Sequence, residues 1–434
     1  MDKIRIGVFG ATRGANVINF CVATDLAEVV AICDKQEAVL DRQREYLGDT
    51  LGYTSVTYYN NFDAFINHPM DAVILANFAT EHAPYAVRCL KKGLHVYSEC
   101  LPCQTMKEAV ELVEAVEESG MIYAYGENFC YMPVPYEMRK LYREGKIGEF
   151  EYGEGEYIHN CMPSWASLTY GDPNHWRNNM YANFYCTHSI GPLIHITGLR
   201  PVSVIGLESK MNERKMAGGA KSGLFGIEMI TLHNGGIVKS IHGDLYKGSL
   251  WYSLSGSKGR MESGREDAER PHNHMIYVNV DEYTREGECK QNYASYSVAP
   301  ENSDIKKSGH LGADYIIMTE FLKKISGDKE ADVIDVYEAL DMFLPGMFAY
   351  RSVLKGGVTM EIPDMRDPAV REQYRNDTMC TDPLVAGDML IPVFSEGNPD
   401  IPEEIYEIQK KTWQKELANK TGYVNAAIIQ GRIK

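Results

Sequence analysis

The chain has 434 residues, of which 44% are hydrophobic and 24% charged, a composition typical of a globular protein with room for two domains. Its formal net charge of −16 argues against nucleic acid and against an anionic membrane as partners, because a phosphate surface binds a basic face. No apolar run approaches the ~20 residues of a membrane span, and a strand is expected at the very start, which leaves no room for a signal peptide. Ten scattered cysteines favour a reducing compartment, so we expect a cytoplasmic protein.

The first elements predict a dinucleotide-binding unit. A short apolar strand, Ile4–Phe9, runs into the turn Gly10-Ala11-Thr12-Arg13-Gly14-Ala15, and a second strand, Val29–Cys33, ends in Asp34. In such units the first glycine makes the tight turn, the helix N-terminus faces the pyrophosphate, and the acid binds the adenosine ribose. Asp34 would repel a 2′-phosphate, which favours NAD over NADP. Thr12 replaces the middle glycine, so the turn alone would also suit an ordinary strand–turn–helix; the spacing to Asp34 favours the nucleotide.

Strands and helices continue to alternate through the first 128 residues. Strands are expected at Val73–Ala76, Leu94–Tyr97 and Met121–Tyr125, and helices at 83–92 and 107–119. This alternation predicts a parallel, doubly wound α/β Rossmann sheet, whose ligands lie beyond the carboxyl ends of the strands. We therefore expect residues 1–128 to form the NAD-binding domain, with a crevice lined by Gly10, Thr12, Arg13, Asp34, Asn77, His82, Glu99 and Asn128.

The second half has a different periodicity and predicts an α+β domain with a large, mostly antiparallel sheet, over residues 129–364. Consecutive strands joined by turns are expected at Glu151–His159, Val202–Leu207, Gly226–Leu232, Gly236–Ile241, Leu250–Ser255 and Met275–Val280. Helices are expected at Asp304–Ile325 and Val333–Leu354. The remaining residues, 365–434, form an acidic, proline-punctuated extension that we expect to pack on the body, with a polar helix at Glu403–Asn419.

The junction between the two domains carries an unusual concentration of reactive side chains. The stretch Ala182–Pro192 holds Tyr185, Thr187 and His188 and then breaks with Gly191-Pro192. Tyr185 and His188 are three residues apart, so on a helical turn they project from the same face. On spacing alone such a pair is more often structural than catalytic.

Four segments of the first domain resemble the glucose–fructose oxidoreductase / inositol dehydrogenase / rhizopine-catabolism (Gfo/Idh/MocA) family: Asn61–Asp63, Asp71–Ala76, Glu81-His82 and Gly93–Glu99. In that family the last strand runs into Glu-Lys-Pro, whose lysine touches the cofactor and the substrate hydroxyl. This chain reads Glu99-Cys100-Leu101-Pro102, which argues against the ordinary mechanism of the sugar dehydrogenases. Cys100 and Cys103 would also suit a redox pair or half a zinc site, but no second cysteine pair follows at metal spacing, so two buried thiols and no metal are expected.

The junction resembles a more specific group, the NAD-dependent glycosidases of glycoside hydrolase family 109, which includes α-N-acetylgalactosaminidases. Asn183–Pro192 is similar to its Asn-Leu-Tyr-Pro-Thr-His-Gly-x-Gly-Pro motif, and Glu127–Tyr131 to its Glu-Asn-x-Cys-Tyr segment. His175-Trp176-Arg177 stands where that group has Trp-Arg, and Ile362–Asp364 also agrees. Phe184 replaces the aspartate that the dehydrogenases of the wider family carry four residues before the histidine.

This resemblance implies a glycosidase whose tightly bound NAD is recycled. The sugar is oxidised at C3, the acidified C2 proton is removed, the aglycone leaves by 1,2-elimination, water adds and the hydride returns. Such chemistry needs proton carriers near C3 and C2 rather than the carboxylate pair of an ordinary glycosidase. We expect Tyr185, His188 and Tyr131 to carry these protons, and Trp176, Arg177, Thr187, His159 and His310 to bind the sugar. The family also implies a homo-oligomer, a dimer or tetramer, formed through the antiparallel sheet.

Structural roles stay open for several of these residues. Tyr131 also suits a packed aromatic, Trp176 and Arg177 a structural cation–π pair, and His310 the start of a helix. Three functions stay open as well: the glycosidase acting on a small glycoside, a net sugar or polyol dehydrogenase, and a non-catalytic sensor of sugars or dinucleotides.

Overall fold

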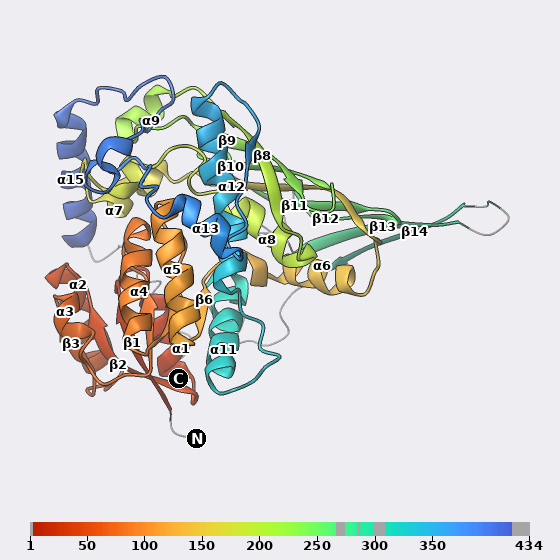
Figure 1. The fold of residues 1–434 in the computed structure, drawn as a ribbon. Helices are drawn as coiled ribbons and strands as arrows, with labels where there is room; N and C mark the ends of the chain where they lie inside the picture. Colours follow the sequence, from red (N-terminus) through yellow and green to blue (C-terminus); the bar gives the residue numbers. More distant parts are fainter. Residues whose placement is uncertain (1–2, 266–273, 284–286, 288, 299–308, 419–434) are drawn as a thin grey trace.

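Two sheets carry the fold of the computed structural model, which describes residues 3–265, 274–283, 287, 289–298 and 309–418 (Figure 1). The strands are β1 Ile4–Phe9, β2 Ala27–Cys33, β3 Thr57–Tyr59, β4 Ala72–Leu75, β5 His95–Ser98, β6 Tyr123–Tyr125, β7 Phe150–Ile158, β8 Pro201–Glu208, β9 Phe225–Leu232, β10 Ile237–Gly243, β11 Ser249–Gly256, β12 Gly259–Ser263, β13 Met275–Tyr283, β14 Cys289–Ser297 and β15 Met360–Glu361. The α-helices are α1 Ala15–Ala23, α2 Glu37–Arg44, α3 Phe62–Phe65, α4 His82–Lys91, α5 Met106–Ser119, α6 Pro133–Arg143, α7 Trp165–Thr169, α8 Thr187–Thr197, α9 Glu213–Gly218, α11 Ala313–Ile325, α12 Val336–Leu354, α13 Pro368–Tyr374, α14 Pro383–Ala386 and α15 Glu403–Ala418.

The first sheet is parallel throughout and confirms the predicted Rossmann domain. Its strand order is β3-β2-β1-β4-β5-β6. All four residues of β4 are buried, as expected for a central parallel strand covered by helices on both faces. The order reverses between β1 and β4, which places a ligand crevice at the carboxyl ends of these two strands.

The turn after β1 needs glycine at its first position. Gly10 has φ +94°, and a Cβ built there would lie 2.3 Å from the backbone of Ala76. A Cβ on Gly14 would lie 2.5 Å from the carbonyl oxygen of Gly10, so the chain passes very close to itself before α1 begins. This tight entry points the N-terminus of α1 at the crevice, as the sequence pattern predicts.

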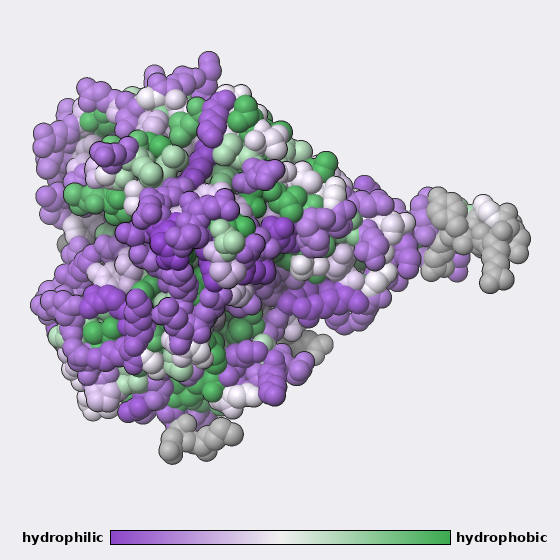
Figure 2. Space-filling model, in the orientation of Figure 1, coloured by the Kyte–Doolittle hydropathy of each residue, from purple (hydrophilic) through white to green (hydrophobic). Residues whose placement is uncertain are grey.

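The second sheet is the predicted large, mostly antiparallel sheet. Its order is β14-β13-β12-β11-β7-β10-β9-β8-β15, and within the described residues only β10 and β7 pair in parallel. Helices α6, α8 and α12 pack on one face of it. The contact between α12 and β8 is so close that a Cβ on Gly206 would lie 2.0 Å from the carbonyl oxygen of Ala349. Seen from the side of Figure 1, the surface is mostly hydrophilic with smaller apolar areas (Figure 2).

Several element boundaries differ from the predictions. The helix predicted at 304–325 begins as a 3-10 turn at His310–Gly312 and continues as α11; its residues 304–308 lie outside the described residues. The helix predicted from Val333 begins at Val336, because the carboxylate of Asp335 accepts hydrogen bonds from the backbone amides of Tyr337 and Glu338. Helix α6 was not predicted, although Pro133 at its first turn is a recognised start signal.

The C-terminal extension packs beside the second sheet. Helix α15 lies against α7 and α9, where the hydroxyl of Tyr406 donates to the carbonyl oxygen of Gly219 and the amide of Gln409 to that of Ala217. This confirms the polar helix predicted at 403–419, of which residue 419 lies outside the described part. None of the helices in the described ranges combines the length and the apolar character that crossing a membrane requires.

Candidate active site

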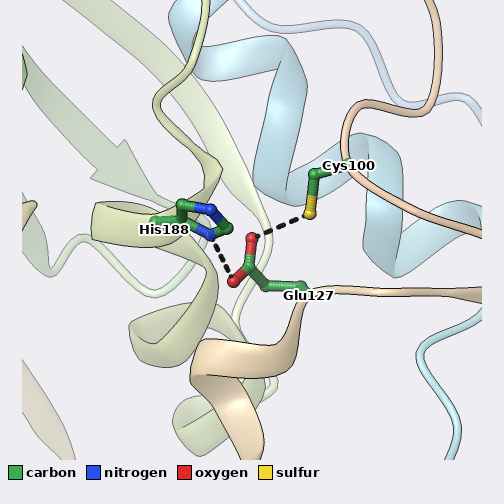
Figure 3. Close-up of side chains that lie close together, drawn as sticks. All are labelled: Cys100, Glu127 and His188. Carbon is green, nitrogen blue, oxygen red and sulfur yellow. Dashed lines mark hydrogen bonds and ion pairs between the residues drawn. The ribbon is translucent and has the colours of Figure 1, made fainter. Parts of the chain in front are cut away.

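A histidine–carboxylate pair lies at the centre of the site, where the first domain meets α8 (Figure 3). Nδ1 of His188 lies 2.7 Å from Oε1 of Glu127, and the hydroxyl of Thr187 donates to Oε2 of Glu127 at 2.8 Å. The backbone amide of Phe129 also donates to Oε1, at 3.2 Å. Glu127 follows β6 and His188 stands in the first turn of α8, so the pair joins the two domains.

The carboxylate of Glu127 is fully buried, yet it stays ionised. Burial alone would raise its pKa, but the charge of His188 and the hydrogen bonds from His188, Thr187 and Phe129 outweigh burial and lower the pKa. When His188 is neutral, the carboxylate fixes the ring proton on Nδ1 and leaves Nε2 as the proton acceptor; when His188 is protonated, Nε2 is a proton donor. The arrangement is therefore suited to general acid–base chemistry at Nε2.

Tyr185 lies beside His188, as the three-residue spacing predicts. The two rings are 5.0 Å apart, edge to face. Tyr185 precedes α8 rather than standing inside it. Burial raises its pKa, with Cys100 and Glu127 adding to the effect and Arg177 opposing it, so the phenol keeps its proton near neutral pH.

Trp176 and Arg177 join this group and form the cation–π pair that the sequence left open. The guanidinium of Arg177 lies 4.3 Å from the ring centre of Trp176 and 5.6 Å from that of Tyr185. The rings of Trp176 and Tyr185 are stacked 6.1 Å apart. The cation–π contact does not prevent Arg177 from binding a ligand, because Arg177 also lines the cavity described below.

Cys100 stands where the family motif has its lysine. Its thiol donates to Oε2 of Glu127 at 3.4 Å, and burial, with Glu127 and Glu99, raises its pKa well above the ordinary value (Figure 3). Donor atoms of Cys100, Glu127 and His188 all lie within 4.8 Å of one another, a grouping compatible with a metal ion. The expectation that no metal is needed therefore stays a prediction.

Two residues have other roles than those expected. The hydroxyl of Tyr131 donates to the carbonyl oxygen of Asp332 at 2.8 Å, and its ring packs on His195 at 5.3 Å, so it is the packed aromatic and not a proton carrier. Thr187 is fully buried and binds Glu127, which makes it a positioning residue rather than a sugar contact.

The crevice of the first domain contains a network centred on Asp314. This carboxylate accepts hydrogen bonds from the amides of Asn128 and Asn16, both at 2.9 Å, and lies 2.9 Å from Nδ1 of His310. Arg13 lies 3.0 Å from Glu99 and 3.7 Å from Asp314. Burial alone would raise the pKa of Asp314, but His310 and Arg13 lower it further than burial raises it. Arg13, Glu99 and Asn128 are thus brought together as predicted, whereas His310 contacts Asp314 instead of an open sugar site.

The remaining predicted cofactor residues lie at the carboxyl ends of β2 and β4. The Asp34 carboxylate accepts from the amides of Ala11 at 2.8 Å and Gln36 at 2.9 Å. Oδ1 of Asn77 is buried without a hydrogen-bond partner among the described residues, which suits a ligand donor. His82 is different: Nδ1 contacts the carbonyl oxygen of Leu101 at 2.9 Å and burial lowers its pKa to about 4, so it is a neutral structural histidine.

These features fit a dinucleotide. The glycine turn leaves no room for a side chain, a helix N-terminus faces the crevice, Asp34 stands at the ribose position, and Asn77 offers an unused acceptor. The hydroxyl of Tyr170, which is hydrogen-bonded to Thr12, lies close to Asp34 at the same end of the crevice.

A small cavity of about 60 Å³ opens beside Tyr185, between the active site and the second sheet. His159 lines it, as expected of a substrate residue, and its ring stacks on Tyr157 at 5.7 Å. Tyr157 also faces His188, with ring centres 4.7 Å apart.

Sequence reasoning missed three residues of this site: Glu127, Tyr157 and Asp314. Glu127 had a usable signal, since it directly follows a parallel strand, where ligands of such sheets bind. Asp314 had none, because Asn128 is 186 and Asn16 is 298 positions away in the chain.

Comparisons with known proteins agree with both domains. Residues 4–127 match the oxidoreductase family with an NAD-binding Rossmann fold, and residues 249–370 match the C-terminal domain of glycosyl hydrolase 109. Glycosyl hydrolase family 109 proteins of Shewanella amazonensis and Shewanella pealeana are each 28% identical, over 203 and 202 residues. These matches cover 44% of this chain and 44% of each relative, so this chain matches less than half the length of these relatives.

Solved structures share the fold at low identity. The myo-inositol 2-dehydrogenase of Lactobacillus plantarum has a TM-score of 0.63 at 18% identity, covering 83% of this chain and 99% of that one. The WlbA dehydrogenase of Bordetella pertussis, in complex with NADH and UDP-GlcNAcA, has a TM-score of 0.63 at 18% identity over 83% and 98%. These structures share the fold of this chain, and the family matches agree with an NAD-binding Rossmann domain followed by a glycosyl hydrolase 109 C-terminal domain.

Proposed function

We propose that this protein is a glycosidase whose NAD is recycled in every turnover. Residues 4–127 match the Gfo/Idh/MocA oxidoreductase family and residues 249–370 match the glycosyl hydrolase 109 C-terminal domain, which supports the proposal. The observation that supports this most is the cluster of Tyr185, His188 and Glu127 beside a thiol. Cys100, a buried thiol with a strongly raised pKa, replaces the lysine that serves an ordinary sugar dehydrogenase. The proton carriers must therefore come from elsewhere.

Bound NAD would supply the transient removal and return of a hydride at C3 of the sugar. Gly10, Arg13, Asp34, Asn77 and Asn128 would hold it. Asp34, at the ribose position, favours NAD over a 2′-phosphorylated cofactor.

His188 and Tyr185 have different tasks: His188 transfers the C2 proton, and Tyr185 stabilises developing negative charge. Because Glu127 holds Nδ1, Nε2 of His188 accepts the proton that C2 gives up when C3 is a ketone. Tyr185 keeps its proton and donates a hydrogen bond to a sugar oxygen, where it lowers the cost of developing negative charge. The aglycone leaves C1 as an oxyanion, which takes up the proton that water loses when its hydroxyl adds to C1. The imidazolium exchanges its proton with solvent and then protonates C2.

The net dehydrogenase is the alternative, and product analysis separates the two. The purified protein is mixed with 4-nitrophenyl glycosides of both anomers, because elimination through a ketone tolerates either. The proposal predicts nitrophenol release with only catalytic NAD and no accumulation of NADH. Steady NADH formation with a free sugar, and no nitrophenol from any glycoside, would select the dehydrogenase.

A further inference from the structure

The cavity beside Tyr185 has an excess of positive charge. Arg177, Lys215 and Asp244 are the charged residues that line it. Asp244 is already paired, since Arg214 donates to its Oδ1 at 2.9 Å. Two cations thus line the cavity with one carboxylate, in a protein whose formal net charge is −16.

Neither lining cation has a carboxylate partner among the described residues. Lys215 is only 4% exposed, and its ammonium donates to the uncharged Ser222 Oγ at 3.0 Å and Gly223 carbonyl at 2.9 Å. The guanidinium of Arg177 lies over the Trp176 and Tyr185 rings instead of on an acid. Burying a charge without a counter-ion costs folding free energy. Such charges are typical of sites where a ligand of opposite charge binds.

The cavity also contains unused hydrogen-bonding atoms. Both ring nitrogens of His242, which is 3% exposed, and Oδ2 of Asp244 are buried without a hydrogen-bond partner among the described residues. Buried polar atoms are normally satisfied, so these atoms mark a place where a polar group binds. The volume of about 60 Å³ would hold on the order of four or five waters, which suits a carboxylate-sized group but not a sugar ring.

We propose that this cavity is a subsite for the carboxylate of an acidic sugar, held by Lys215 and Arg177. The sugar ring would lie over Tyr185, which lines the same cavity. The planar guanidinium of Arg177 matches a carboxylate in geometry, while Lys215 supplies a point charge with a donor to spare. The substrate class of the proposed glycosidase is then the uronides. This inference rests on the proposed function only in calling the acidic sugar a substrate. The subsite itself requires only that the sugar binds.

Binding to the NAD-loaded protein tests the subsite without any bond cleavage. Isothermal titration compares glucuronate with glucose and galacturonate with galactose. We expect each acid to bind at least tenfold more tightly than its neutral partner. The Lys215→Met variant, which keeps length and apolar volume, should lose most of this preference and leave the affinity for the neutral sugars unchanged. Lys221→Met is the matched control, because Lys221 donates to Asn179 and does not line the cavity.

Equal affinity for acidic and neutral sugars, or a Lys215→Met variant that weakens both alike, would overturn the proposal. If that variant does not fold, the pH dependence of acid binding to the wild-type protein still tests the proposal. Burial, with a smaller contribution from Arg214, lowers the pKa of Lys215 to about 8. Asp244, Glu208 and Cys161 act in the opposite direction and raise this pKa, but by less. Affinity for the acid should therefore fall about tenfold between pH 7 and pH 9, and a constant acid preference over that range would contradict the subsite. If acids bind preferentially but no glycoside is cleaved, the glycosidase fails and the subsite stands.

Discussion

Nδ1 of His188 lies 2.7 Å from Oε1 of Glu127, and that carboxylate has no exposed surface. The contact joins the last strand of the Rossmann sheet to the first turn of α8, so folding of the two domains against each other assembles the base. The chemistry proposed here depends on this contact more than on any other.

Removing either the base His188 or the hydrogen-bond donor Tyr185 should abolish most turnover while the cofactor site stays intact. We expect Tyr185→Phe and His188→Gln each to lower the rate of aglycone release by about 10² to 10⁴, the usual contribution of one positioned acid or base. Both variants should still retain NAD, measured by nucleotide analysis after gel filtration. Tyr152→Phe, on the outer face of the sheet, is the control. Full turnover in either variant would refute the assignment.

Glu127→Gln should weaken both catalysis and acid-dependent stability. Because the folded-state pKa of Glu127 lies below the ordinary glutamate pKa of 4.5, the ionised form stabilises the fold above that pH. This stabilisation is lost as the pH falls through the folded-state pKa. We expect the variant to be less stable than wild type by about 1–3 kcal/mol at pH 7, with the difference shrinking below pH 4.5. Thermal unfolding of both proteins across this range measures it. A difference independent of pH would show that Glu127 is not ionised in the fold.

Asp34 should determine the affinity for NAD. Asp34→Ala removes the acid from the predicted ribose position and should raise the Kd for NAD about tenfold or more. The difference in affinity between NAD and NADP should become smaller. Fluorescence titration of the cofactor-stripped protein provides the measurement. Asp25→Ala, at a fully exposed acid after α1, should leave the affinity unchanged. Unaltered NAD binding in Asp34→Ala would place the ribose elsewhere.

The outer face of the second sheet should join two copies of the chain. Five exposed apolar side chains share this face across four neighbouring strands: Ile205, Leu207, Met229, Ile237 and Tyr152. Such a patch is unusual on a monomer, and the opposite face is already covered by helices. We expect light scattering to give the mass of a dimer or tetramer, and Leu207→Lys with Met229→Lys to reduce it. Leu384→Lys, at a fully exposed residue elsewhere, is the control. A monomeric wild-type protein would contradict the proposal.

The parts predicted well from sequence are those that repeat a local pattern. The parallel sheet, the glycine turn and Asp34 follow from strand–helix alternation and a fixed spacing, and the stretch around Tyr185 and His188 from a motif. The role of Tyr131 could not be derived in this way. Tyr131 is held by Asp332, 201 positions later, and Asp314 binds Asn128 and Asn16 from two distant segments, so only the tertiary fold reveals these contacts.

Turnover in deuterated water tests the central claim most directly. If the base near C2 removes a proton from a C3 ketone, the released sugar carries deuterium at C2 and keeps its original hydrogen at C3, while the amount of NAD stays constant. Aglycone release without deuterium at C2 would mean direct hydrolysis and would contradict the account.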